Sequence, residues 1–285
     1  MLLRNVTIGA DPELFIIDKT TGKVVSSIGL IPGVKGEPYV AEDMPKGFGL
    51  ETDNILAEFN IPPVKDCASF ITNIQYMHDY IRKYVQNINP NYDIKCSASE
   101  IVDEDQLQSE QANEFFCEPD FNAYTEEENP KPAVPKDGTR SCGCHLHWGY
   151  DNNNIDDSLY IIRLCDAFIG VPSVILDPDT RRRNIYGKAG SFRLTAYGVE
   201  YRSLSSFMQS NPDLLTFVWN GIERVKREAG RPTVDIFKYS SHIRECINNS
   251  DVKLAEKLCK IFRIDYLPGL EPDKKPESIS NEIPW

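Results

Sequence analysis

Three short segments of the sequence carry pairs of ionisable side chains that lie two residues apart. The pairs are Asp11 and Glu13, His145 and His147, and Glu200 and Arg202. In a β-strand, residues two apart lie on the same face of the sheet. Strands that bring these pairs together would form a site of carboxylates and imidazoles, which suits a hard divalent cation such as Mg²⁺ or Mn²⁺. One such pair is also typical of a solvent-facing strand, so the hypothesis depends on having three.

The segment 140–149, RSCGCHLHWG, allows two interpretations of its cysteines and histidines. A tight turn could gather them around one zinc ion. In a strand, Cys142 and Cys144 would lie on one face and His145 and His147 on the other, so they could not close a tetrahedral site. We favour the strand, because no partner pair elsewhere completes a zinc motif. The cysteines are then expected to be small core residues behind the sheet.

A further acidic segment lies between residues 50 and 61. Glu58 is flanked there by apolar residues, and Asp53 precedes it by five positions. Because this separation is odd, one strand face could hold both only if a bulge or a turn intervenes. Glu51 is also an odd number of positions away, so the sequence leaves open whether Asp53 or Glu51 faces the site.

The segment 181–193 is strongly basic in an otherwise acidic chain. It holds five cations in thirteen residues: Arg181, Arg182, Arg183, Lys188 and Arg193. Such a cluster suits a polyphosphate or a carboxylate. Gly187 and Gly190 favour a close approach of the backbone. The alternative is a basic surface loop. Neither a Walker loop nor a dinucleotide GxGxxG motif is present, so a bound nucleotide would depend on metal ions and arginines.

Composition excludes several functional classes. The formal net charge is -12 and the pI is about 4.9, which argues against non-specific binding to nucleic acid or to an anionic membrane. We find no apolar run of the roughly 18 residues that a membrane span needs and no secretion signal, and we expect a cytoplasmic protein. The eight cysteines are therefore expected to be reduced thiols.

The elements indicate a mixed α+β fold without a regular βαβ rhythm. Strands are predicted at 6–17, 23–27, 50–61, 140–149 and 198–204, and helices at 66–86, 156–168, 211–230, 234–247 and 251–262. Asp66 suits an N-cap, Pro212 suits a first helical position, and His78 is expected to be structural or exposed. Residues 100–139 are predicted to be a long surface excursion. We expect one domain at 1–265 and a poorly packed arm at 266–285.

Five motifs in order resemble the phage-type carboxylate–amine ligases of the glutamine synthetase and glutamate–cysteine ligase superfamily. They are GADPELF, DNxxxEFNxPP, GCHLHWG, RRxxYGKAGxFR and GVEYRSLS, and they span about residue 7 to about residue 205. The resemblance implies a curved antiparallel sheet that forms a partial barrel, with helices on its outer face. It further implies that the concave face binds ATP and two or three ions of Mg²⁺ or Mn²⁺.

The resemblance also implies roles for individual residues. The implied metal ligands are Asp11, Glu13, Asp53, Glu58, His145 and Glu200. The implied ATP or phosphate contacts are His147, Arg182, Arg183, Lys188 and Arg193, and the substrate contacts are Arg202, Tyr186 and Asn60. Catalytic roles fall on Arg193, Glu200 and Arg202. Asp11 stands where the superfamily usually has glutamate, and because aspartate is shorter, the resemblance implies that Asp11 ligates through water.

The implied reaction transfers the γ-phosphoryl group of ATP to a carboxylate and lets an amine displace phosphate from the resulting acyl phosphate. The alternatives are a phosphotransferase of the related guanidino-kinase type and a non-catalytic nucleotide-binding module. The acid and amine could be small molecules, peptides or proteins. The sequence leaves open these substrates, the general base, the oligomeric state and the role of the last 80 residues or so. If the protein is phage-encoded, it would act in the host cytoplasm.

Overall fold

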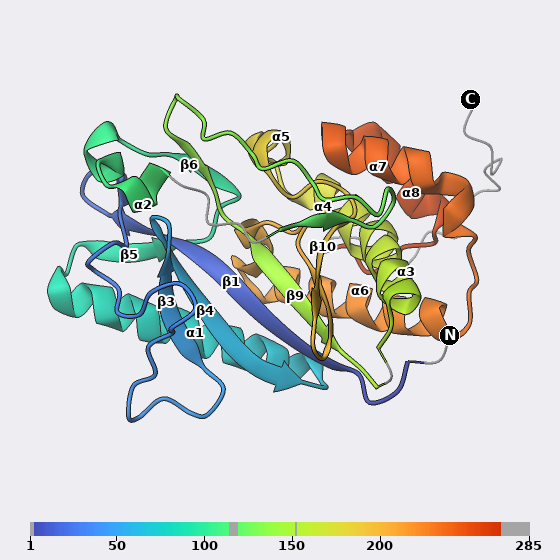
Figure 1. The fold of residues 1–285 in the computed structure, drawn as a ribbon, viewed down its shortest axis with the longest axis horizontal. Coiled ribbons are helices and arrows are strands. Elements are labelled where there is room, and N and C mark those ends of the chain that lie inside the picture. The colour runs from blue at the N-terminus through green and yellow to red at the C-terminus, as the bar shows by residue number, and fades with distance from the viewer. Residues whose placement is uncertain (1–2, 114–118, 152, 269–285) are drawn as a thin grey trace.

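The computed structural model describes residues 3–113, 119–151 and 153–268. Within these residues, nine antiparallel strands form one sheet (Figure 1). Its main path follows β3 (Gly49–Asp53), β4 (Leu56–Val64), β1 (Thr7–Asp18), β9 (Cys144–Gly149), β11 (Gly198–Tyr201), β10 (Ser191–Thr195) and β7 (Phe121–Asn122). Two further strands, β2 (Val24–Val25) and β5 (Tyr92–Lys95), pair with β1. The predicted α+β class is confirmed. The described strands do not close into a barrel, because the path ends at β3 and β7.

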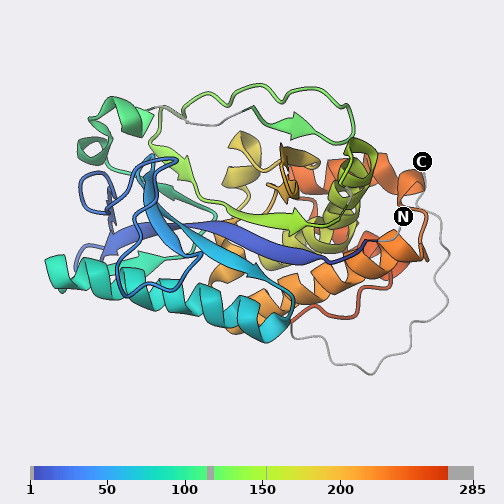
Figure 2. The ribbon, with the colours of Figure 1, turned by 60° about the horizontal axis from the view of Figure 1, so that its bottom comes forward.

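Helices α1 (Cys67–Ile88) and α6 (Pro212–Gly230) cover one face of the sheet, as Figure 2 shows. Asp66 caps α1 by accepting a hydrogen bond from the Ser69 backbone N–H, and Asn211 caps α6 in the same way from Leu214. Both helices were predicted with these starts, and both predictions are confirmed. Their apolar sides pack together through Phe70 and Trp219, whose ring centroids are 5.5 Å apart.

The core under the sheet is formed by the residues that alternate with the ionisable pairs. On β1 these include Ala10 and Leu14, on β9 Leu146, and on β11 Tyr201, all of which are buried in the main hydrophobic cluster. Since successive side chains of a strand point to opposite faces, this packing turns the ionisable pairs away from α1 and α6. The core therefore fixes which face of the sheet can carry the site.

Replacing Ile81 with alanine is expected to lower the free energy of unfolding by about 2–5 kcal/mol. Ile81 is fully buried on the inner side of α1, so its removal would lose apolar contacts and leave a cavity. Ile88→Ala in the same helix is the matched control, because Ile88 is 53% exposed. Urea denaturation of both variants tests this; equal losses would contradict the placement of α1.

The predicted helix at 156–168 is longer than expected. It begins as α3 (Ile155–Cys165), widens into a π-turn (Asp166–Gly170), and continues as α4 (Val171–Leu176). An 18-residue window of this 22-residue helix reaches a mean hydropathy of 1.8, so the expectation that no apolar run reaches membrane-spanning length was wrong. The helix is 78% buried in the fold, as is the core helix of a soluble protein.

The last predicted helices are confirmed with small changes. A 3₁₀ turn (Ile236–Tyr239) leads into α7 (Ser240–Asn249), and α8 (Val252–Ile261) follows. The short α5 (Arg181–Ile185) starts the basic segment, which was considered as a possible loop.

Most of the predicted C-terminal arm, residues 269–285, lies outside the described residues. His78 has a structural role, which is one of the two roles predicted for it: its Nε2 lies 2.9 Å from Gln209 Oε1, within hydrogen-bond distance.

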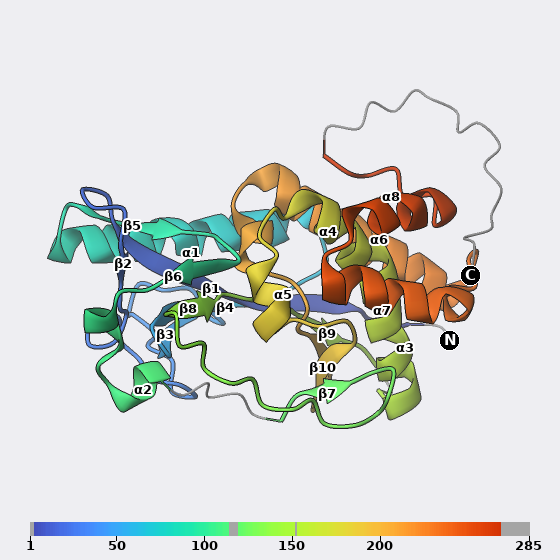
Figure 3. The ribbon, with the colours of Figure 1, turned by 90° about the horizontal axis from the view of Figure 1, so that it is seen from above.

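The predicted excursion at 100–139 is more ordered than expected. A 3₁₀ turn (Glu104–Leu107) and α2 (Glu110–Asn113) follow β6 (Ser99–Ile101), which pairs with β8 (Thr139–Ser141). The strand β7 joins the main sheet beside β10. Figure 3 shows that the part of the segment carrying β7 passes on the side of the sheet opposite α1 and α6. It was predicted as a surface loop, but part of it belongs to the sheet.

Candidate functional site

Strand register brings the three predicted pairs onto one face of the sheet. Asp11 lies opposite His145, and Glu200 lies opposite His147. On the other side of β1, Glu13 lies opposite Glu58. Residues directly opposite each other in an antiparallel pair share a face and have neighbouring Cβ atoms. The register therefore creates a continuous band of ionisable side chains across five strands, which extends to Arg193 on β10, opposite Glu200.

The first cluster consists of Asp11, His147 and Glu200, whose potential ligand atoms lie within 4.8 Å of one another. His147 Nε2 is 3.1 Å from Asp11 Oδ2, while its Nδ1 is held 2.5 Å from the Tyr197 hydroxyl. Fixing one imidazole nitrogen in this way orients the other toward a metal ion. His145 lies beside the cluster, with Nδ1 3.5 Å from Asp11 Oδ1 and 3.3 Å from Glu200 Oε1. The resemblance implied His145 as the ligand and His147 as its neighbour, whereas this geometry groups His147 with the carboxylates.

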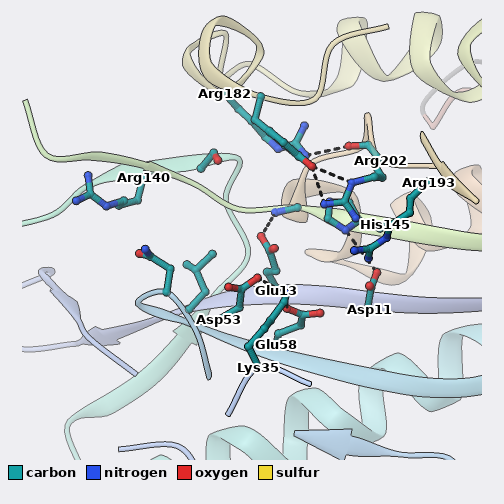
Figure 4. A pocket seen from close by; sticks show the side chains of 15 residues that line it. Asp11, Glu13, Lys35, Asp53, Glu58, Arg140, His145, Arg182, Arg193 and Arg202 are labelled. Atoms are coloured by element: carbon teal, nitrogen blue, oxygen red, sulfur yellow. Dashed lines mark hydrogen bonds and ion pairs between the residues drawn. The ribbon is translucent and has the colours of Figure 1, made fainter. Parts of the chain in front are cut away.

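The second cluster consists of Glu13, Asp53 and Glu58, again with ligand atoms within 4.8 Å of one another. A turn at Asn54, which has a φ of 54°, lets Asp53 and Glu58 face the same side. This is the turn that the odd separation required. Glu51 lies opposite Glu58, but its Oε2 accepts a hydrogen bond from the Gly36 N–H. Of the two residues, Asp53 lines the pocket (Figure 4).

The pKa values of Asp11 and Glu200 are shifted in the opposite direction to those of Glu13 and Glu58. Burial disfavours the charge of Glu200, but attraction to Arg202 and His145 outweighs it and holds the pKa well below its usual value. The pKa of Asp11 is also lowered, because His147 outweighs the effect of burial. Burial raises the pKa of Glu13, and burial together with the charge of Asp11 raises that of Glu58. The first cluster is thus balanced by cations, whereas the second has an excess of negative charge.

Two arginines flank Glu200. Arg193 Nε donates to Glu200 Oε2 at 2.7 Å, and Arg202 Nη1 donates to Oε1. Arg202 also donates from Nε and Nη2 to the Tyr186 hydroxyl, at 2.8 and 2.6 Å. These contacts bring together four of the predicted substrate or catalytic residues, Tyr186, Arg193, Glu200 and Arg202. They orient both guanidinium groups at the side of the pocket that the first cluster borders (Figure 4).

The other basic residues differ in position. Arg182 lines the pocket, but it is almost fully buried and donates to the backbone oxygens of Ser203 and Arg202 at 2.8 and 3.3 Å. Arg183 points elsewhere, toward Ser173 and Asp177. Neither Arg183, Lys188 nor Asn60 is among the described residues that line this pocket. The missing Cβ of Gly187, whose φ is 70°, leaves room for the Arg182 guanidinium, so the group that approaches the backbone here is the chain's own arginine.

Sequence reasoning missed several residues of the site. Lys35 reaches both Asp53 and Glu58, and Arg140 lines the same pocket. Asp120 is buried and lies 3.8 Å from Arg202 Nε; burial raises the pKa of this carboxyl. The one available signal was Lys35 itself, a lone cation between glycines in the segment GLIPGVKGEP. Asp120 lies in the acidic excursion, where nothing distinguished it from its neighbours.

The cysteines behave as predicted in part. The described cysteines are free thiols, and both Cys142 and Cys144 are buried. Cys144 belongs to β9 and points away from His145, which excludes a zinc site shared by these residues. Cys142 lies before β9 and packs in a smaller hydrophobic cluster with Phe15 and Val24. The parity argument therefore holds for Cys144 but not for Cys142.

Gly143 joins the two clusters. Its backbone N–H donates to Glu13 Oε2 at 2.5 Å, and its carbonyl oxygen accepts from the Glu13 N–H at 3.0 Å. A Cβ at this position would lie 2.6 Å from His145 Nε2 and 3.3 Å from Arg182 Nη2. Only glycine leaves these two side chains where they are.

Gly143→Ala is therefore expected to displace the His145 ring and to lower the free energy of unfolding by about 1–3 kcal/mol, the usual cost of overpacking. Chemical denaturation and the NMR signals of the histidine rings would measure both effects. Gly9→Ala is the control, because its added Cβ would meet its nearest neighbour, His147 Cβ, at an ordinary 3.5 Å. A Gly143 variant that matches Gly9→Ala in both measurements would contradict this geometry.

The donor set fits a divalent cation. Asp11 Oδ1, His145 Nε2 and His147 Nε2 are buried and make no hydrogen bond within the described part of the chain. Buried polar atoms usually have a partner, so Asp11 Oδ1 and His147 Nε2, which belong to one cluster of potential ligands, favour a cation there. Carboxylate oxygens with imidazole nitrogen suit Mn²⁺ or Mg²⁺ better than a soft ion.

Comparison with known protein families now adds an independent finding. Residues 135–219 match the family model described as "Phage phiEco32-like COOH.NH2 ligase-type 2". This segment, about a third of the chain, is therefore similar to that ligase family. The segment carries β9, β10 and β11, and so the histidines, Arg193, Glu200 and Arg202. The carboxylates of β1, β3 and β4 lie outside it. Since COOH–NH2 ligases join a carboxylate to an amine, the family is one of carbon–nitrogen ligases.

Curated proteins and solved structures were compared with the chain as well. A search of curated proteins found no match. Among solved structures, the bifunctional glutathione synthetase from Pasteurella multocida aligns at 11% identity with a TM-score of 0.41. The alignment covers 90% of this chain and 49% of that one, so this chain spans about half the length of the synthetase.

Proposed function

We propose that this chain is an ATP- and Mg²⁺-dependent ligase that joins a carboxylate to an amine through an acyl phosphate. The observation that carries the proposal is the band of ionisable residues across β10, β11, β9, β1 and β4, with two groups of cation ligands side by side. The match of residues 135–219 to a COOH–NH2 ligase family supports the reaction class.

Each side of the pocket has a separate role in this proposal. Divalent ions, when held by carboxylates of this band, would neutralise the charge of the nucleotide phosphates. Arg193 and Arg202 would contact the transferring phosphoryl group and the substrate carboxylate, since guanidinium groups match the geometry of both. Glu200 holds both arginines in place. The Tyr186 hydroxyl fixes the orientation of Arg202.

The proposed ligation has two steps. A carboxylate oxygen attacks the γ-phosphorus of ATP, and the bond to the bridging oxygen breaks to release ADP. The amine nitrogen then attacks the acyl carbon, inorganic phosphate leaves, and the nitrogen loses one proton to a base. Both steps build charge on phosphoryl oxygens, which fixed cations stabilise most effectively when their positions are set in advance.

ADP release and amide formation, measured with and without candidate amines, test the proposal. Amine-dependent ADP release with a matching amide is expected. A stable phosphorylated acid and no amide would instead identify a phosphotransferase. Binding of Mg·ATP with no turnover, and with no change in a Glu200→Ala variant, would identify a non-catalytic module.

Several features of the protein belong to the same proposal. We place the ligase domain at 1–265 and expect the sheet to curve as in glutamine synthetase, with the pocket on its concave side. The substrates would be small-molecule, peptide or protein acids and amines. The acidic net charge of -12 favours neither nucleic acid nor an anionic membrane as partner, which suits a cytoplasmic enzyme.

A further inference from the structure

Lys35 lies between the carboxylates of the second cluster. Its Nζ is 2.5 Å from Asp53 Oδ2 and 2.9 Å from Glu58 Oε2. Figure 4 shows its side chain reaching toward Asp53 and Glu58, at the side of the pocket away from Arg202. A cation bridging two carboxylates has the position that a shared metal ion would take. Lys35 therefore lies where the proposed function expects a divalent ion.

The backbone around Lys35 is docked on the edge of the sheet. Tyr39 and Leu50 exchange two hydrogen bonds, at 2.8 and 3.0 Å, and the Thr52 N–H donates to the Gly33 oxygen at 3.3 Å. The Gly36 N–H donates to Glu51 at 3.0 Å. These contacts tie both sides of the turn to β3. Lys35 is thus held in place by a folded turn, unlike a surface lysine whose pairing with a carboxylate depends on its side chain alone.

Gly33 makes this close docking possible. Its φ is 86°, and a Cβ there would lie 2.4 Å from the Leu50 oxygen and 2.7 Å from the Tyr39 nitrogen. A side chain at this position would push the turn away from β3. The sequence thus allows a tight approach that brings a lysine over the carboxylates.

The charges of the two clusters differ in a way that this turn explains. The first cluster has two carboxylates, with Arg193 and Arg202 bound to one of them. The second cluster has three carboxylates, and the lysine is the cation that bridges two of them among the described residues. An ammonium group is a compact point charge with three donors, so it can satisfy two carboxylates at once.

We propose that Lys35 is a built-in cation of the second cluster, which takes the place of a divalent ion there and leaves the first cluster as the metal site. The inference rests on the proposed function for its catalytic meaning. In this proposal, the Lys35 side chain supplies part of the positive charge that neutralises the nucleotide phosphates. The number of bound ions is then smaller by one than the two clusters would otherwise hold.

Counting bound Mn²⁺ on the full-length protein by equilibrium dialysis, without nucleotide, tests the proposal. Lys35→Met removes the charge and keeps the length of the side chain, and it is expected to bind one more Mn²⁺ per chain than the wild type. Lys35→Arg keeps the charge and is expected to bind the wild-type number. The matched control is Lys23→Met, because Lys23 pairs with Asp103 on the surface.

A second variant locates the added ion. Combining Lys35→Met with Glu58→Gln should return the count to that of the wild type, since the second cluster would then lack a ligand. Circular dichroism of each variant confirms that it folds. Equal counts for the wild type and Lys35→Met, or a lower count in Lys35→Met, would overturn the proposal.

The outcome separates this inference from the proposed ligase activity, because the count needs neither ATP nor substrates. A gain of one ion in Lys35→Met in a protein that forms no amide supports the role of Lys35 and rejects the ligase. Amide formation together with equal counts supports the ligase and rejects the role of Lys35.

Discussion

Replacing Glu200 with glutamine is expected to reduce ligase turnover by about 10²–10³-fold. Removal of one group that is fixed in position to stabilise the charge of a transition state usually has an effect of this size. Glu200 is fully buried and binds Arg193, Arg202 and His145. Glutamine fills the same space without the charge, so both guanidinium groups would lose the anion that orients them. Breaking a buried ion pair in this way is also expected to cost about 3–5 kcal/mol of the free energy of unfolding.

Turnover at saturating ATP and urea denaturation measure the two effects of Glu200→Gln. The matched control is Glu223→Gln, because the Glu223 carboxylate pairs with Lys226 on the outer side of α6 and is 43% exposed. The control is expected to change stability by less than about 1 kcal/mol, as surface ion pairs usually do. If both variants behaved alike, Glu200 would have no special role in holding the arginines.

Asp11→Asn is expected to weaken Mn²⁺ binding at the first cluster by more than about 100-fold. Loss of a residue that only supports a metal ligand already costs roughly 10–100-fold in affinity, and Asp11 would itself be a ligand. Asp11 is buried and lies within contact distance of both histidines, so its carboxylate is the central anion of the cluster. Asparagine keeps one oxygen but loses the charge that attracts a cation.

Isothermal titration calorimetry with MnCl₂ measures this loss of affinity for Asp11→Asn. Asp79→Asn is the control, because Asp79 lies on the exposed side of α1 and its side chain is 66% exposed. Unchanged Mn²⁺ affinity in Asp11→Asn would place the metal elsewhere and would leave the first cluster as an ion-pair network.

The sequence predicted those parts of the structure that local patterns determine. The apolar spacing after Asp66 predicted α1, and Asn211 with Pro212 predicted the start of α6. The alternation of residues in 9–15 and 143–149 predicted which side chains share a face. These signals are local, because capping and periodicity depend on neighbours a few positions away.

The parts that were missed depend on contacts between distant segments. No local signal states that Glu200 pairs with His147, or that Lys35 lies over Glu58, because register between strands is set by the whole sheet. The same holds for β7, a two-residue strand in an acidic segment that is ordered by its partner β10. The apolar helix at 155–176 was underestimated because Asp166 and Gly170 interrupt its pattern at the π-turn.

The band of opposed residues across the sheet also limits where related chains can differ in length. An insertion of one residue into β9 would turn Leu146 toward the site and the histidines into the core, since a slip by one position exchanges the two faces of a strand. Insertions in the segment around 119–140, which pairs with the sheet through the two residues of β7, leave that parity intact. We therefore expect relatives to keep the lengths of β1, β9 and β11 and to differ in their connecting loops, where new substrates could be accommodated without disturbing the ligands.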